Sequence, residues 1–200
     1  MALANYTDLQ ASVAAWMNRS DLTALIPDFI AIAEARIQDD LRVRQMITEV
    51  NLNTVIATQK IALPADWLEF KSVVYAGDPM EYMPLDRIKE YADETGRSDP
   101  LGYSIEGLNL IVAPTPATVY AIATTYYAKV PAIATASTNW LLTKYPNIYL
   151  YGSLVSANQY TMDMQKADYW GGLYTQAIAV ASGSNDRALS SGSPLRIRTR

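Results

Sequence analysis

Residues 27–54 read PDFIAIAEARIQDDLRVRQMITEVNLNT, and this stretch decides the fold because the spacing of its apolar residues changes halfway along it. The first part carries an apolar stripe at helical spacing, made of Phe29, Ile30, Ala33, Ile37 and Leu41. From Met46 onwards the residues alternate with a period of two, which is typical of a strand. We therefore predict a helix over Pro27–Arg44 followed by a strand, in a protein of the α+β class.

The two ends of this helix carry the expected signals. Pro27 suits the first helical turn, where the N–H group that it lacks would be unpaired in any case. Asp28 in the first turn and Arg44 in the last complement the helix dipole. The adjacent pair Asp39 and Asp40 is no candidate for acid–base catalysis, because neighbouring helix residues do not face each other.

A β-rich insertion follows, which we place at residues 46–134. Its segments combine alternating patterns with Val, Ile, Thr and Tyr, and they are separated by Gly and Pro turns. Predicted strands cover 46–54, 55–63, 67–75, 103–105, 108–112 and 118–130, with an extended piece at 80–84 and a short helix at 85–91.

Helices flank the insertion on both sides. A short one is predicted at 6–17 with Thr7 as its N-cap, and two more at 146–160 and 164–181. We therefore expect residues 1–45 and 135–182 to form a four-helix bundle. The Gly171-Gly172 pair inside the last helix indicates either close packing against a neighbouring helix or a local weak point.

The C-terminal segment differs in charge from the rest of the chain. Residues 187–200 hold four of the 16 basic residues and no acidic one, so they carry +4, and the remainder, with 12 basic and 20 acidic residues, carries −8. Near the end, apolar or hydroxyl side chains alternate with arginines over Leu195, Arg196, Ile197, Arg198, Thr199 and Arg200. A lone strand behind a Ser/Gly spacer has no strand to pair with, so we expect residues 183–200 to be an extended arm that binds a partner. The alternative is a frayed, solvated terminus.

The composition argues against an enzyme. The chain has no histidine and no cysteine, which removes the usual general base, the usual zinc ligands and every Ser-His or Cys-His arrangement. No phosphate-binding glycine loop, nucleophile elbow or calcium loop is present. The acidic residues at 81–94 accompany Lys89 in segments that we expect to face solvent, so we predict no catalytic residue, no metal site and no cofactor.

Charge and hydropathy limit the partners further. The net charge of −4 argues against a general nucleic-acid-binding protein. No window approaches eighteen consecutive apolar residues, so we expect no membrane span, and the first residues do not resemble a signal peptide. Fourteen tyrosines against two phenylalanines favour contact surfaces, although half-buried positions explain most of them.

Four stretches, in this order, resemble the head-to-tail adaptor proteins of short-tailed bacteriophages, which are also called connector or head-completion proteins. The first is Leu25–Ile37 followed by Asp39–Arg42, and the second is Leu63–Phe70. The third is NWLLTKYPNIYLYG at residues 139–152, and the fourth is DRA at 186–188 with SGSPLRI at 191–197. Each stretch is short, and their joint order carries the resemblance.

This resemblance implies a structural virion protein at the neck of one capsid vertex, with the host cytoplasm as the place of assembly. Proteins of this kind form a ring, commonly of twelve copies, beneath the portal. The helical bundle would carry the ring, the C-terminal arm would dock on the portal protein, and other parts would receive the tail nozzle or tube. DNA would pass through the lumen without sequence-specific binding.

Two other functions stay open at this point. The first is another ring-forming component of the tail or of the head–tail joint. The second is a small metal-dependent hydrolase, against which the lack of histidine and cysteine weighs.

Overall fold

The computed structural model describes residues 3–91 and 99–190. It confirms a mixed α+β protein, in which N- and C-terminal helices pack together and two four-stranded sheets lie between them in the sequence. The described residues fall into two compact units. The helical unit comprises the residues before Gln45 and those from Val130 onwards, and the β unit comprises Gln45–Lys129.

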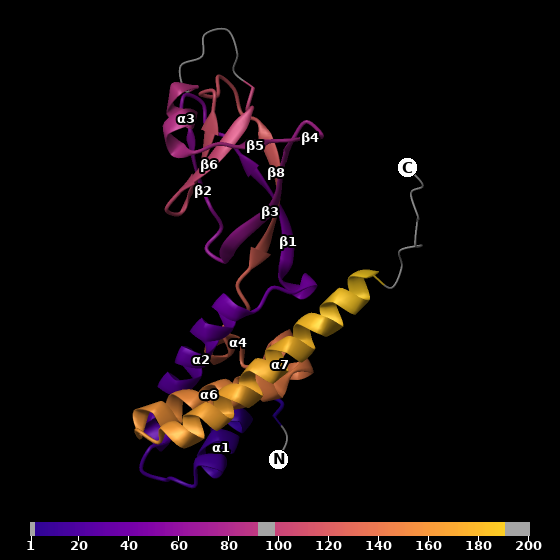
Figure 1. The fold of residues 1–200 in the computed structure, drawn as a ribbon. Helices are drawn as coiled ribbons and strands as arrows, with labels where there is room; N and C mark the ends of the chain where they lie inside the picture. Colours follow the sequence, from indigo (N-terminus) through magenta and orange to yellow (C-terminus); the bar gives the residue numbers. More distant parts are fainter. Residues whose placement is uncertain (1–2, 92–98, 191–200) are drawn as a thin grey trace. The chain divides into compact units, whose positions relative to one another are not determined.

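The helical unit is built around α6 (Pro146–Tyr160), which packs against α1 (Tyr6–Met17), α2 (Ile26–Asp40), α5 (Trp140–Lys144) and α7 (Met164–Ser190) (Figure 1). Ten of its fifteen residues are buried, on all sides of the helix. The predicted stripe of α2 is confirmed, because all five of its residues are buried. The short helices η1 (Thr23–Leu25) and α4 (Ile133–Ala136) complete the unit, and neither of them was predicted from the sequence.

Two helix boundaries differ from the prediction. α2 ends at Asp40 and not at Arg44, because Leu41 and Val43 are both buried and the chain there is already extended. Arg42 Nη1 donates to the carbonyls of Gln38 and Leu41, which would otherwise be unpaired at this helix end. The N-cap of α1 is Asn5 and not Thr7, since Asn5 Oδ1 accepts the N–H of Asp8 at 2.9 Å.

The β unit is two facing sheets. One has the strand order β1 (Ile47–Asn53), β8 (Ala121–Ala128), β3 (Trp67–Tyr75) and β4 (Asp78–Pro79), and it is antiparallel throughout. The other has the order β2 (Lys60–Ala62), β7 (Asn109–Ala113), β6 (Gly102–Glu106) and β5 (Glu81–Tyr82), with β5 parallel to β6. Side chains from both sheets form one core of Leu52, Ile61, Val73, Met80, Leu110, Val112 and Ile122.

A second, smaller core lies under α3 (Leu85–Glu90) and contains Met83, Ile88, Ile111 and Ala113. Since β7 contributes to both cores, it is buried on both faces, which explains its continuous apolar run. Gly102 on the neighbouring strand leaves room for Met83, because a Cβ atom there would lie 2.6 Å from Met83 Cε.

The predicted strand over 55–63 is wrong in its first half. Residues 55–58 form a turn in which the Thr58 N–H donates to the Val55 carbonyl, and β2 covers only Lys60–Ala62. The β6–β7 hairpin turns at Gly107 and Leu108, one residue later than predicted, where Gly107 takes the positive φ of 59°. The short helix η2 (Arg44–Met46) precedes β1.

Candidate interaction surface

The predicted arm residues Leu195, Arg196, Ile197, Arg198, Thr199 and Arg200 lie outside the described residues. The structure describes the helix that leads to them. α7 continues to Ser190, nine residues beyond its predicted end at Ala181, so residues 183–190 are helical and not extended.

Side-chain hydrogen bonds explain why the Ser- and Gly-rich end of α7 is helical against its weak propensity. Asn185 Oδ1 accepts the backbone N–H of Arg44 at 2.8 Å. Arg187 Nε donates to the Gly183 carbonyl one turn earlier. A hydrogen bond between the hydroxyl groups of Ser184 and Tyr145 lowers the pKa of Tyr145.

The start of α7 is held by aromatic contacts. Trp170 is the centre, with ring centroids 5.4 Å from Trp16 of α1, 5.8 Å from Tyr151 of α6 and 5.0 Å from Tyr169 beside it. The Tyr151 and Trp170 rings are stacked, at an interplanar angle of 24°. Trp170 therefore joins three helices of the unit at one point.

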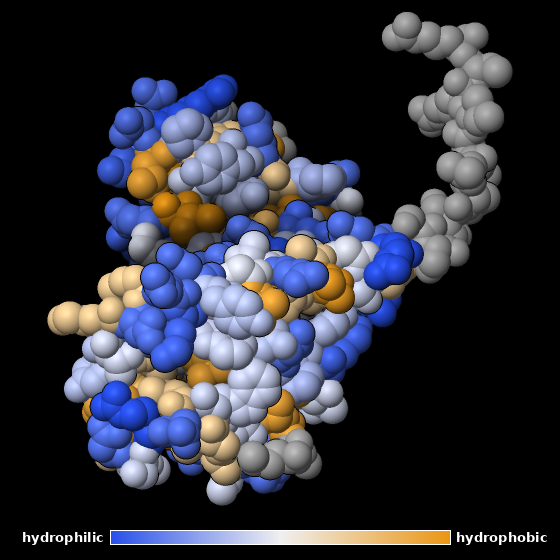
Figure 2. Space-filling model, turned by 60° about the horizontal axis from the view of Figure 1, so that its bottom comes forward, coloured by the Kyte–Doolittle hydropathy of each residue, from blue (hydrophilic) through white to orange (hydrophobic). Residues whose placement is uncertain are grey.

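The helical unit exposes large apolar side chains at the ends of α1 and α6 and at the start of α7. We call this the aromatic surface, and it consists of Trp16, Tyr151, Tyr160, Met162, Met164, Tyr169 and Trp170. All of them except Tyr151 and Trp170 are more than half exposed. On the face of the helical unit seen in Figure 2, pale and orange side chains lie between blue hydrophilic ones. Aromatic residues and Met are the residue types that protein–protein interfaces favour.

A pocket of about 520 Å³ adjoins this surface at Trp16 and Trp170. Its lining residues come from the ends of α1 and α6 and the start of α7: Trp16, Met17, Asn18, Arg19, Asn158, Thr161, Asp163, Lys166 and Trp170. Asn18 closes α1 in the left-handed conformation, with φ of 51°, and its N–H donates to the carbonyls of Ala14 and Ala15.

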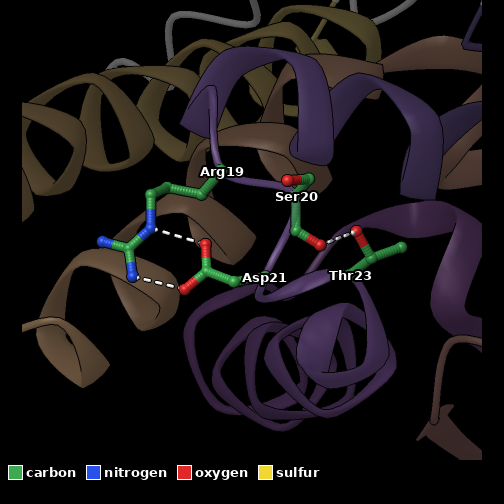
Figure 3. Close-up of polar contacts among 4 residues, drawn as sticks. All are labelled: Arg19, Ser20, Asp21 and Thr23. Atoms are coloured by element: carbon green, nitrogen blue, oxygen red, sulfur yellow. Dashed lines mark hydrogen bonds and ion pairs between the residues drawn. The ribbon is translucent and has the colours of Figure 1, made fainter.

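The charged groups of the pocket are paired. Arg19 donates from Nε and Nη2 to the two carboxylate oxygens of Asp21, at 2.7 and 2.6 Å (Figure 3). Lys166 Nζ lies 2.7 Å from Asp163 Oδ2. These hydrogen bonds lower the pKa of both carboxyl groups. Because its charges are neutralised in pairs, the pocket suits contact with another protein better than capture of a charged small molecule.

The loop that carries Arg19 is braced locally. Thr23 Oγ1 donates to the Ser20 carbonyl at 2.9 Å, which closes the turn between α1 and η1 (Figure 3). The pair Arg19–Asp21 is exposed, so it orders the loop and adds little stability.

Within residues 3–91 and 99–190, no group of three Asp or Glu side chains could hold a metal ion. The described carboxylates Glu81, Asp86 and Glu90 are exposed, while Asp93 and Glu94 lie outside the described residues. No helix in these ranges is long and apolar enough to cross a bilayer.

Sequence reasoning missed the aromatic surface. The spacing of Trp170 and Tyr174 shows which side of α7 packs against other helices. It does not show at which residues those other helices end and leave side chains of the unit exposed. The usable signal was Met162 in the break between two helices, where a polar turn is the norm, with Met164 directly after that break at the start of the second helix.

A family model described as SU10 adaptor protein matches residues 4–198. No curated protein matches the chain.

Proposed function

Because the chain belongs to the SU10 adaptor protein family, a family of phage head–tail adaptors, we propose that it forms a ring that joins the capsid portal to the tail. The match over residues 4–198 carries this proposal, since it spans both units and reaches into the predicted arm. The role of the family is structural, and we infer that the chain has no enzymatic activity. Its location would be the neck of the virion, after assembly in the host cytoplasm.

The helical unit, as a four-helix bundle around α6, would carry the ring, which we expect to contain twelve copies. A ring closes through two different faces of each subunit, so one face of every copy must be matched by another face of the next. The aromatic surface supports this role, because exposed Tyr, Trp and Met side chains are typical of interface centres, and its two Trp residues line a pocket.

The C-terminal arm would dock on the portal protein. Leu195 and Ile197 would fill apolar pockets, while Arg196, Arg198 and Arg200 would pair with acidic groups of the portal. The strict alternation of these residues supports strand addition, and the family match extends through Arg198. Thr199 would lie on the same side as Leu195 and Ile197.

DNA would pass through the lumen of the ring without sequence-specific contacts. The chain outside residues 187–200 carries a charge of −8, and an acidic wall does not hold phosphates as a basic one would. A solved ring with a mainly basic lumen would contradict this part of the proposal.

Electron microscopy of the purified protein mixed with its portal tests the function directly. The expected result is a ring of twelve copies seated on the portal. Co-purification with tail proteins, and not with the portal, would instead support the alternative of another ring-forming component of the tail or of the head–tail joint.

The aromatic surface has its own test. Tyr169→Glu places a charge at a 62% exposed position of this surface, and Tyr82→Glu is a matched control at a 58% exposed position in the β unit. Both tyrosines make one T-shaped contact with a neighbouring ring. We expect Tyr169→Glu to reduce ring formation on the portal at least about tenfold and Tyr82→Glu to leave it unchanged, as measured by native mass spectrometry. Equal ring formation by the two variants would mean that the aromatic surface is not part of the contact between subunits.

A further inference from the structure

The β unit exposes an apolar tip at one end of its first sheet. We call residues 53–59 and 113–120 the uncharged tip. The first segment begins at the last residue of β1, and the second connects the last residue of β7 to β8. Val55, Ile56 and Val119 are 54%, 57% and 59% exposed. The tip lies at the opposite end of β1 and β8 from Gln45 and Lys129, where the chain enters and leaves the unit.

Hydrogen bonds between its two segments make the tip rigid. The Ala57 N–H donates to the Pro116 carbonyl at 2.8 Å, and the Thr54 N–H donates to the Tyr120 carbonyl at 2.9 Å. The Thr54 hydroxyl, which is buried, accepts the Tyr120 N–H at 2.8 Å and donates to the Thr118 carbonyl at 3.2 Å. A preorganised tip of this kind loses little conformational entropy when it binds.

The tip contains no charged residue in either segment, the seven positions of 53–59 and the eight of 113–120, although 18% of the chain is charged. Exposed loops normally carry polar and charged side chains, because apolar groups in water are unfavourable. Three exposed β-branched side chains on a braced and uncharged loop pair are therefore a feature to be explained.

We propose that the uncharged tip inserts into an uncharged apolar pocket on a different protein of the virion. This inference rests on the proposed function, since it takes the chain to be a virion adaptor. Val55, Ile56 and Val119 would be buried in that pocket. An uncharged partner fits because burying a charge of the partner against this tip would leave that charge unpaired.

The chemistry of the tip argues against three other partners. DNA requires basic groups for its phosphates, and the tip has none. Binding to an anionic lipid surface requires free Lys or Arg side chains beside the inserted apolar residues. The first Lys or Arg in the sequence after residues 53–59 is Lys60, which is paired with Glu106 at 2.5 Å.

The third partner to weigh is a second copy of this chain. Each of four hollows on the described surface is lined by at least one charged residue: Arg19, Asp163 and Lys166 in one, Asp78 and Asp99 in another, Glu49 in a third, and Arg36, Asp40 and Asp168 in the fourth. Burying the tip in any of them would take charged or ion-paired groups out of water and set them against apolar side chains, which costs free energy even where a charge keeps its partner.

The experiment uses the phage that encodes this chain, with its own copy of the gene inactivated and variants supplied from a plasmid. The test variant is the double substitution Val55→Asp with Ile56→Asp. The matched control is Leu108→Asp, since Leu108 is 71% exposed in the turn at the far end of β7 from the tip. Thermal unfolding of each purified variant checks that exposed substitutions leave the fold intact.

We expect the double variant to lower the infectious titre at least about 100-fold, because two side chains that would be buried in the partner's pocket are replaced by charged ones. Leu108→Asp should stay within about threefold of the unaltered protein. A normal titre for the double variant would overturn the proposal.

A second measurement does not depend on the charged variants. Val119→p-benzoylphenylalanine, irradiated in purified particles, should form a covalent product with a peptide of a different virion protein. A product with DNA, with lipid or with a second copy of this chain would overturn the proposal, as would no product at all. The proposed function itself fails in a distinguishable way, namely if the unaltered chain is absent from purified particles.

Discussion

At the scale of single residues, two side chains of α2 hold the segment that follows the β unit. The Gln38 side chain forms two hydrogen bonds of 2.9 Å with the N–H and the carbonyl of Val130, as a neighbouring strand would. One turn earlier, Glu34 Oε1 accepts the N–H of Ile133 at 2.9 Å and the Tyr149 hydroxyl at 3.4 Å. Burial raises the pKa of Glu34, although these two hydrogen bonds oppose the shift.

Glu34 makes the stability of the protein depend on pH. Because its pKa is raised above the ordinary value of 4.5, the folded protein holds this proton more tightly than the unfolded chain does. This group therefore contributes less stability as the pH rises from 4.5 through the raised value. Glu34→Gln keeps an oxygen that accepts the Ile133 N–H and does not ionise. We expect the variant to gain stability relative to the unaltered protein between pH 4 and pH 7, measured by urea unfolding.

The comparison between the two proteins removes the contributions of all other titrating groups. Glu90→Gln, at an exposed position of α3, is the control for the loss of a carboxyl group. The difference in unfolding free energy between the unaltered protein and Glu34→Gln should change from pH 4 to pH 7. An equal difference at these two pH values would contradict this account.

Asn139 is the most connected polar side chain of the same region. It is buried, and its amide donates to the Pro131 carbonyl at 2.7 Å and to the Tyr149 hydroxyl at 2.8 Å. Its Oδ1 accepts the Leu142 N–H at 2.8 Å as the N-cap of α5. Asn139→Ala should therefore lower the unfolding free energy by about 2–4 kcal/mol, since one cap and two buried hydrogen bonds are lost.

Chemical denaturation checks this value. Tyr149→Phe removes only one member of the network and should cost about 1 kcal/mol. Asn51→Ala, at an exposed position of β1, is the control. A cost for Asn139→Ala no larger than that of the control would show that these hydrogen bonds do not hold the segment.

At the scale of elements, glycines on two packed helices should respond in opposite ways to the same substitution. A Cβ atom at Gly171 or Gly172 of α7 meets no atom of the described chain within 4 Å, so close packing inside the subunit does not explain this pair. At Gly152 of α6 it would lie 3.1 Å from the Ala33 Cβ atom of α2.

Gly171→Ala and Gly172→Ala should each raise the unfolding free energy by about 0.5–1 kcal/mol, because alanine loses less entropy in a helix. Gly152→Ala should instead lower it, since α2 and α6 would have to move apart. Thermal melting of the three variants decides the question. Destabilisation by the α7 substitutions would mean that the pair is needed for a contact within the subunit.

The elements also show what the sequence can predict. The bounds of α1, α6 and β3 agree with the prediction at both ends, because each begins and ends at a clear break in the sequence, such as Pro146 at the start of α6. The ends of α2 and α7 were wrong for a tertiary reason. Burial of Leu41 and Val43 makes the chain extended directly after Asp40, so α2 ends early. The hydrogen bond from the Arg44 N–H to Asn185 stabilises the C-terminal end of α7, so this helix ends late.

The candidate sites were predictable to different degrees. The arm was proposed from charge and alternation alone, which are visible in the sequence. The aromatic surface was not, because whether Tyr169 and Tyr160 are covered depends on where neighbouring helices end. Residues 53–59 of the uncharged tip were assigned to strands, although the absence of charge over them was available from the sequence.

At the scale of the whole molecule, the chain divides into two units with separate cores and a basic C-terminal segment. Every helix and strand that the structure describes ends at or before Ser190. A deletion of residues 191–200 therefore leaves all of them complete, whereas a deletion from Arg187 would remove the last turn of α7. The shorter deletion is the sharper test of the proposed arm.

We expect the protein that ends at Ser190 to keep its melting temperature and to lose binding to the portal, as measured by co-sedimentation. The arm would supply both the strand hydrogen bonds and the arginine pairs with the portal, so the truncated protein would lack every contact of this docking mode. Arg196→Ala, Arg198→Ala and Arg200→Ala combined in the full-length chain should weaken binding and reduce its dependence on salt, since the screened ionic part is removed while Leu195 and Ile197 remain. Replacement of the same three arginines by lysine keeps the charge and is the matched control. Portal binding by the truncated protein at the level of the full-length chain would refute the arm.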